Sequence, residues 1–205
     1  KCKNILYLNS IFNSQARIYA KSYFDYLSQL FKNLNYLEIE LFILELLRAR
    51  NNGNNIFFIG NGGSSSTASH FANDLAIGTK SFKKPFKAIC LTDNQAITTA
   101  VGNDHGYHEI FKYQLQCYAN PNDAVVAISA SGNSPNLVNA IEYANANNLI
   151  SISLTGFDGG TLKKISKKNI HVKTDIGEYA PVEDIHMTIV GLTGSYLINY
   201  VKNES

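Results

Sequence analysis

The sequence has few cysteines, and those it has lie far apart. Cys2, Cys90 and Cys117 are the three cysteines among its 205 residues, and none is in a C-x-x-C spacing. Disulfide-rich secreted domains and cysteine-rich zinc sites need several closely spaced cysteines, so this pattern excludes both. The cysteine content predicts a protein of the reducing cytoplasm.

Long apolar runs and an excess of charge of one sign are also missing. No run reaches the about 18 apolar residues of a membrane-spanning helix, and the first ten residues, K-C-K-N-I-L-Y-L-N-S, lack the apolar core and cleavage site of a signal peptide. The 18 basic and 16 acidic residues give a net charge of only +2, which does not indicate a nucleic-acid partner. We therefore expect a cytoplasmic protein that works with neither a membrane nor a nucleic acid.

What is present is the composition of one packed globular domain. Apolar residues make up 45% of the chain and charged residues 17%, far from the profile of a disordered protein. A chain of this length buries one good core. We treat residues 1–205 as a single domain, with N-terminal helices over 1–52 and an α/β core over 53–205.

The first quarter of the chain has the apolar spacing of two helices. Between Phe12 and Leu34, apolar residues recur every three or four positions, which predicts one long amphipathic helix. The stretch Leu37–Arg50 predicts a second helix, apolar nearly all round. Such a helix needs cover on more than one face, which another subunit can supply. The pattern therefore predicts a homo-oligomer.

After Asn51-Asn52-Gly53, short apolar runs alternate with helical stretches. The predicted strands are 56–59, 86–91, 124–129, 150–155 and 170–172. The predicted helices are 66–77, 95–101, 109–118, 135–147, 162–166 and 181–200. This β-α-β-α order, with short β-branched strands, predicts an α/β fold: a three-layer αβα sandwich around a mostly parallel sheet.

Two of the predicted strand-to-helix turns are rich in glycine and serine. The first follows the strand in I-F-F-I-G-N-G-G-S-S-S-T-A-S-H-F, and the second is I-S-A-S-G-N-S-P-N. Such turns lie where parallel sheets bind ligands, and their glycines let backbone N–H groups point at one anion. The nucleotide P-loop pattern and the dinucleotide fingerprint are both absent. Glycine and serine also make ordinary turns and caps, but two such turns in equivalent places favour a cradle for a phosphate monoester.

Two pairs of carboxylate and imidazole groups accompany these turns. His70 and Asp74 lie one turn apart on the helix after the first turn, and Glu183 and His186 lie three apart on the last helix, so each pair shares a helix face. The four groups could bind a divalent metal, or supply the acid and base that move a proton next to a carbonyl. Each pair could equally be a surface hydrogen bond.

These motifs resemble the SIS (sugar isomerase) domain family, and within it the phosphoheptose isomerase group, which converts sedoheptulose 7-phosphate to the corresponding aldose phosphate. The resemblance covers nearly the whole chain and rests on G-N-G-G-S-S-S-T-A-S-H-F-A-N-D-L, T-D-N, G-N-D-H-G-Y, I-S-A-S-G-N-S-P-N, L-T-G-F-D-G-G and V-E-D-I-H. It implies a five-stranded parallel sheet flanked by helices, a homotetramer, and active sites at subunit boundaries.

The resemblance also implies roles for individual residues. The residues expected to hold the substrate and its phosphate are Asn61, Gly62, Gly63, Ser64, Asp93, Ser129, Ser131 and Ser134. His70, Asp74 and Glu183 match positions that help to bind zinc in relatives, with Asp74 in place of a glutamate and Glu183 in place of a glutamine. The two carboxylate–imidazole pairs themselves, and not the resemblance, lead us to predict Asp74, Glu183 and His186 as the catalytic residues.

One departure from the family pattern bears on activity. Active relatives have a histidine eight residues after the position of Glu183, as a metal ligand and acid or base; this chain has Gly191. His186 does not replace that histidine, because five residues on a helix turn a side chain by roughly 140° and shift it by about 7.5 Å. A smaller departure is Lys80, near where many relatives carry a substrate-facing arginine.

The sequence therefore leaves two functions open. The favoured one is a sugar-phosphate aldose–ketose isomerase that acts on sedoheptulose 7-phosphate with zinc as a cofactor. The alternative is a non-catalytic phosphosugar-binding or regulatory SIS protein, of the type associated with the replication initiator. Gly191 favours the alternative, whereas His70, Asp74, Glu183 and His186 favour the isomerase, since a pure binder has little need of them.

Overall fold

The computed structural model describes residues 7–204, so Cys2 and most of the N-terminal decapeptide lie outside the described residues. The strands are β1 (Asn55–Gly60), β2 (Lys87–Cys90), β3 (Ala124–Ser129), β4 (Ile150–Thr155) and β5 (Lys168–His171). The helices are α1 (Ala16–Lys32), α2 (Tyr36–Asn52), α3 (Gly63–Asn73), α4 (Gln95–Asp104), α5 (Ile110–Tyr118), α6 (Pro135–Ala146), α7 (Gly160–Ile165) and α8 (Tyr179–Asn203), with short helical turns η1 (Leu8–Ile11), η2 (Asp74–Gly78) and η3 (Tyr107–Glu109).

The five strands form one parallel sheet in the order β2-β1-β3-β4-β5. The chain leaves β1 for β2 at one edge and then returns to β3 on the other side of β1. The strand order therefore reverses between β1 and β3. In open parallel sheets, ligands bind beyond the carboxyl ends of the strands at such a reversal.

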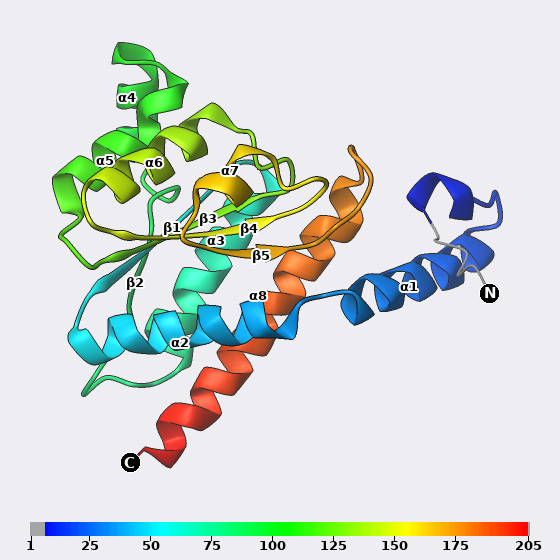
Figure 1. The fold of residues 1–205 in the computed structure, drawn as a ribbon, viewed down its shortest axis with the longest axis horizontal. Coiled ribbons are helices and arrows are strands. Elements are labelled where there is room, and N and C mark those ends of the chain that lie inside the picture. Colours follow the sequence, from blue (N-terminus) through cyan, green and yellow to red (C-terminus); the bar gives the residue numbers. More distant parts are fainter. Residues whose placement is uncertain (1–6, 205) are drawn as a thin grey trace.

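Helices cover both faces of the sheet, which confirms the predicted three-layer α/β fold. Figure 1 shows α2, α3 and α8 on one face and α5, α6 and α7 on the other. Successive residues of a strand point to opposite faces: Ile56 and Phe58 join the core beneath α2 and α3, whereas Phe57 and Ile59 join the core beneath α5 and α6. The central strands β1 and β3 are apolar on both sides because neither of their faces meets water.

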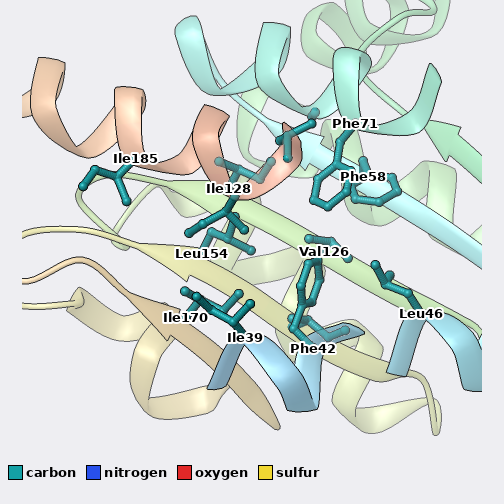
Figure 2. Close-up of a cluster of buried hydrophobic side chains, with 14 of the residues drawn as sticks. Ile39, Phe42, Leu46, Phe58, Phe71, Val126, Ile128, Leu154, Ile170 and Ile185 are labelled. Carbon is teal, nitrogen blue, oxygen red and sulfur yellow. The ribbon is translucent and has the colours of Figure 1, made fainter. Parts of the chain in front are cut away.

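Aromatic rings join α2, β1 and α3 in the first of these cores (Figure 2). The ring centroids of Phe58 and Phe71 lie 4.8 Å apart, and those of Phe42 and Phe71 lie 5.7 Å apart. All three side chains are fully buried. The N-terminal helix α2 is thus part of the main core, and the position of α3 is fixed by packing on both sides.

The prediction of one long helix from Phe12 to Leu34 is wrong at its start. The chain forms η1, then an irregular segment, and α1 begins only at Ala16. The side-chain oxygen of Asn13 accepts a hydrogen bond from the backbone N–H of Gln15 at 2.9 Å, a local bond that competes with helix formation. Phe12 consequently lies outside the helix and is 75% exposed.

The third helix begins three residues earlier than predicted and does not run regularly to Ile77. Gly62 has a positive φ of 53°, a conformation that glycine adopts readily, and the helix starts directly after it. At Asp74 the chain changes to the wider π-type turn η2. The first serines of the glycine-serine turn therefore belong to the helix itself.

The surface has exposed apolar side chains on α2, the helix that the sequence predicts to be covered by another subunit. Leu37, Leu41 and Leu44 of α2 are 57%, 40% and 52% exposed, and α1 projects away from the body of the molecule (Figure 1). Within residues 7–204, no helix is both long enough and apolar enough to cross a membrane.

Candidate functional site at the reversal of strand order

The two glycine-serine turns lie side by side. We call residues 60–66 the first elbow and residues 129–135 the second elbow. They follow the neighbouring strands β1 and β3, in which Gly60 pairs with Ile128. The side-chain amides of Asn61 and Asn136 exchange two hydrogen bonds of 2.9 Å each. These bonds hold the two elbows next to each other, which is necessary if both are to bind one ligand.

The first elbow presents an open helix start. Gly62 is exposed, and no atom lies within 4 Å of where a side chain at this position would begin. Helix α3 has no side-chain cap, so its first N–H groups keep their capacity for a ligand. Beside the first elbow, the carboxylate of Glu183 lies against Gly63, where an added Cβ would be 2.7 Å from Glu183 Oε2.

The serines of the second elbow divide into two kinds. Ser129 Oγ accepts a hydrogen bond from the N–H of Gly132 at 3.1 Å, and Ser131 Oγ accepts one from the N–H of Asn133 at 3.3 Å. Ser134 is the N-cap residue of α6 but makes no capping bond. Ser129 and Ser131 thus shape the loop, whereas the hydroxyl of Ser134 is available at the helix start.

The loop after β4 supports the second elbow from behind. Gly132 has a φ of +64°, and a Cβ added there would lie 2.1 Å from the carbonyl oxygen of Gly159. The side-chain oxygen of Asn133 accepts hydrogen bonds from the N–H and hydroxyl of Thr161, at 2.9 and 3.0 Å. The elbow is therefore held against residues 159–161.

His70 and Asp74 form the close pair that their spacing predicts, with 3.1 Å between Nε2 and Oδ2. Glu183 does not join them. It lies at Gly63, the first residue of α3, whereas Asp74 directly follows the last residue of that helix, a separation of about 16 Å at the rise of a helix. In the described part of the chain, no three His, Cys, Asp or Glu residues are grouped as metal ligands. One chain supplies two of the predicted zinc ligands together, which does not complete a zinc site, so zinc stays a prediction.

His186 is not at the mouth of the site. Its side chain is completely buried, and neither ring nitrogen has a hydrogen-bond partner within residues 7–204. Burial lowers the pKa of His186 to about 4, contact with the backbone of Thr155 opposes this change, and the nearby His171 adds to it. Because the buried ring has no contact with solvent, the structure does not support the predicted catalytic role of His186.

Asp93 follows β2 and is tied to α3. Its Oδ2 accepts a hydrogen bond of 3.2 Å from the hydroxyl of Ser69, the residue before His70, and its Oδ1 accepts one of 3.3 Å from Thr92. Asp93 is exposed. Its predicted role in holding the substrate stays a prediction.

The comparison with known proteins agrees with this geometry. The sequence model of the SIS domain matches residues 19–156. The chain belongs to the SIS domain family. It is 34% identical over 171 residues to a probable phosphoheptose isomerase of Thermoplasma acidophilum, covering 83% of this chain and 93% of that protein. It is 38% identical to a phosphoheptose isomerase of Nitratidesulfovibrio vulgaris, covering 73% of each chain.

Solved structures resemble this SIS domain over nearly its whole length. A phosphoheptose isomerase from Francisella tularensis matches with a TM-score of 0.78 and 29% identity, over 92% of this chain and 100% of that chain. A phosphoheptose isomerase from Neisseria gonorrhoeae matches with a TM-score of 0.79 and 26% identity, over 90% and 98%.

The structure adds two residues of this SIS domain that the sequence did not single out. Asn136 is buried and paired with Asn61, and the hydroxyl of Tyr107 donates a hydrogen bond of 3.0 Å to Asn61 Oδ1. Tyr107 ends the quoted motif G-N-D-H-G-Y, and Asn136 ends I-S-A-S-G-N-S-P-N. Asn61 is engaged by both neighbours, so in this state it positions the elbows rather than offering a free amide to a ligand.

Gly191 of the SIS domain faces open space. It is exposed on α8, and no atom lies within 4 Å of the position that a Cβ would take. A larger side chain can therefore be introduced at this position without a clash.

Proposed function

We propose that this SIS domain is a phosphoheptose isomerase that interconverts sedoheptulose 7-phosphate and the corresponding aldose phosphate. The observation that carries the proposal is the pair of adjacent elbows at the reversal of strand order, where two helix starts without side-chain caps face the same edge of the sheet. Partial positive charge at helix starts favours a phosphate group. The relatives named phosphoheptose isomerase support the choice of sugar.

The elbows would hold the phosphate of the open-chain sugar. The hydroxyl of Ser134 and the first N–H groups of α3 supply neutral donors, whereas α6 begins with Pro135, which has no N–H, and Ser64 is only 6% exposed. The Asn61–Asn136 pair fixes the spacing of the two elbows. A ligand held at one end presents its other end in few orientations, which is a large part of the rate enhancement available to an enzyme.

A carboxylate would then move the proton. Glu183 borders the first elbow at Gly63 and is our candidate base, which requires the C1 end of the open-chain sugar to curve back toward that elbow. It would take a proton from C1 of the ketose while the C2 carbonyl oxygen is protonated, giving an enediol. Return of a proton to C2, with loss of the hydroxyl proton at C1, leaves the aldose, so atoms and charge balance.

The second acid–base group would come from a neighbouring chain. Within residues 7–204 of one chain, His70 and Asp74 are not grouped with Glu183, so we propose that the site lies at a subunit boundary of a homotetramer. A zinc ion would also need ligands from more than one chain, and no step above depends on it.

The test is to mix the purified protein with sedoheptulose 7-phosphate, with and without added zinc, and to follow the aldose product by NMR. We expect turnover, a raised KM in Ser134→Ala, and an increase of ~10²-fold or more in kcat for Gly191→His, because a positioned acid or base contributes ~10²–10⁴-fold. Binding without turnover in both proteins would favour the non-catalytic alternative, which the named relatives do not favour.

A further inference from the structure

Two tyrosines connect α1 to the start of α8. The hydroxyl of Tyr23 donates a hydrogen bond of 2.6 Å to Asp184 Oδ2, and the hydroxyl of Tyr26 donates one to Glu178 Oε2. The two tyrosines lie one turn apart on the same face of α1. Although α1 projects from the body of the molecule (Figure 1), it is anchored at this point.

Glu178, directly before α8, gathers donors from three segments. Besides the bond from Tyr26, its Oε1 accepts from the N–H of Leu8 at 2.6 Å and its Oε2 from the N–H of Asp175 at 3.3 Å. Glu178 is only 5% exposed. A buried carboxylate is stable only when hydrogen-bonded, so these donors fix where the last helix begins.

The first turns of α8 in turn touch the supports of both elbows. The carboxylate of Glu183 lies against Gly63 of the first elbow, and the methyl groups of Val182 fill the space beside Gly156. The ring of Tyr179 packs edge-on against Phe157, with 5.0 Å between centroids. Residues 156–160 back the second elbow, so the start of α8 sets the place of Glu183 relative to both elbows.

We propose that Tyr23 and Tyr26 are positioning residues for Glu183, acting through Asp184 and Glu178. This inference rests on the proposed function of Glu183. A displacement of about 1 Å at a reacting group can cost about 10²-fold in rate, whereas the phosphate contacts of the elbows do not involve α1. Loss of a tyrosine hydroxyl should therefore reduce kcat and leave KM nearly unchanged.

Both tyrosines remain donors at physiological pH. Burial raises the pKa of Tyr23 and of Tyr26 above the usual value, and the hydrogen-bonded carboxylates Asp184 and Glu178 raise each further. The two bonds therefore persist across the pH range of an activity assay.

The experiment compares Tyr23→Phe and Tyr26→Phe with the control Tyr19→Phe. All three changes remove one hydroxyl from α1, but Tyr19 packs through its ring against Phe12 and Tyr23. We expect kcat for sedoheptulose 7-phosphate to fall about 10-fold or more in the first two variants, with KM changed less than about twofold, and no change in the control. An active wild-type protein with unchanged kcat in both variants would overturn the inference while the proposed function stands.

Two further measurements separate positioning from general stability. In the double variant Tyr23→Phe/Asp184→Ala, the second change should add little to the first, because each single change removes the same hydrogen bond. Additive losses would overturn the route through Asp184. Amide hydrogen exchange needs no substrate and should quicken at residues 179–186 in Tyr26→Phe but not in Tyr19→Phe. An inactive wild-type protein would contradict the proposed function. Unchanged amide exchange in Tyr26→Phe would overturn the anchoring of α8, whether or not the protein is active.

Discussion

At the scale of single residues, the backbone decides which side chains the elbows tolerate. Gly132 combines a positive φ with close approach to the carbonyl oxygen of Gly159, so a side chain there is both strained and obstructed. Gly191 has neither constraint: it lies in the interior of α8 and faces open space. Two glycines of one chain therefore have opposite consequences for stability.

We predict that Gly132→Ala lowers the free energy of unfolding by ~1–3 kcal/mol, whereas Gly191→Ala raises it by up to ~1 kcal/mol. Urea denaturation followed by circular dichroism measures both. The second variant serves as the control for the first, since each adds one methyl group. Equal effects of the same sign would show that local backbone conformation does not control stability at these sites.

The sequence predicted the composition of the elbows but not how they are held together. Glycine and serine after a strand are visible along the chain, because the pattern is local. The Asn61–Asn136 pair joins residues 75 positions apart, and only the pairing of β1 with β3 brings them together. The separation of Glu183 from His70 was equally hidden, since it depends on how α8 lies against α3.

At the scale of elements, the first turns of α8 border the candidate site, while another side of the same helix packs into the core. Glu183 borders the first elbow, whereas His186, three residues later, is enclosed completely. Sequence spacing shows that two residues share a face of a helix but not how the fold covers that face. Strands β3 and β4, in contrast, match their predicted bounds, because the continuous apolar run of β3 and the alternating apolar residues of β4 are local patterns in the sequence.

We predict that stability decreases in acid because the folded chain holds the buried His186 and the half-buried His171 in the neutral form. Burial lowers the pKa of each from 6.5 to about 4, and the positive charge of Lys163 adds to the effect at His171. Between these two values the unfolded chain binds more protons than the folded chain, so stability is full above about pH 6.5 and falls as the pH approaches 4. For His186 the loss is on the order of 3 kcal/mol by pH 4.

Urea denaturation at pH 7, 6 and 5 tests this prediction, with His186→Leu as the comparison. In the variant, the free energy of unfolding should depend less strongly on pH, and the remaining dependence should be the part that is due to His171. The same slope in both proteins would mean that the ring of His186 does not titrate on unfolding.

At the scale of the whole molecule, one chain leaves apolar surface exposed and keeps the predicted acid–base groups apart. Both features indicate that a second copy of the chain completes the structure. Apolar side chains remain exposed on α2 and on the outer side of α8, where Leu192 and Tyr196 are both open to solvent. Contiguous exposed apolar surface marks an interaction site. The predicted acid–base groups are also divided, with Glu183 at one end of α3 and the His70–Asp74 pair at the other.

We predict that the protein is a homo-oligomer, and that Leu41→Glu/Leu44→Glu shifts it to a smaller species in light scattering at micromolar concentration. Each new carboxylate would have to be buried unpaired in the interface, which costs several kcal/mol. Gln116→Glu on α5, across the sheet, is the control and should keep the native mass. A wild-type monomer would contradict the prediction. Turnover should decrease together with the mass, because one chain alone keeps Glu183 roughly three helical turns from Asp74.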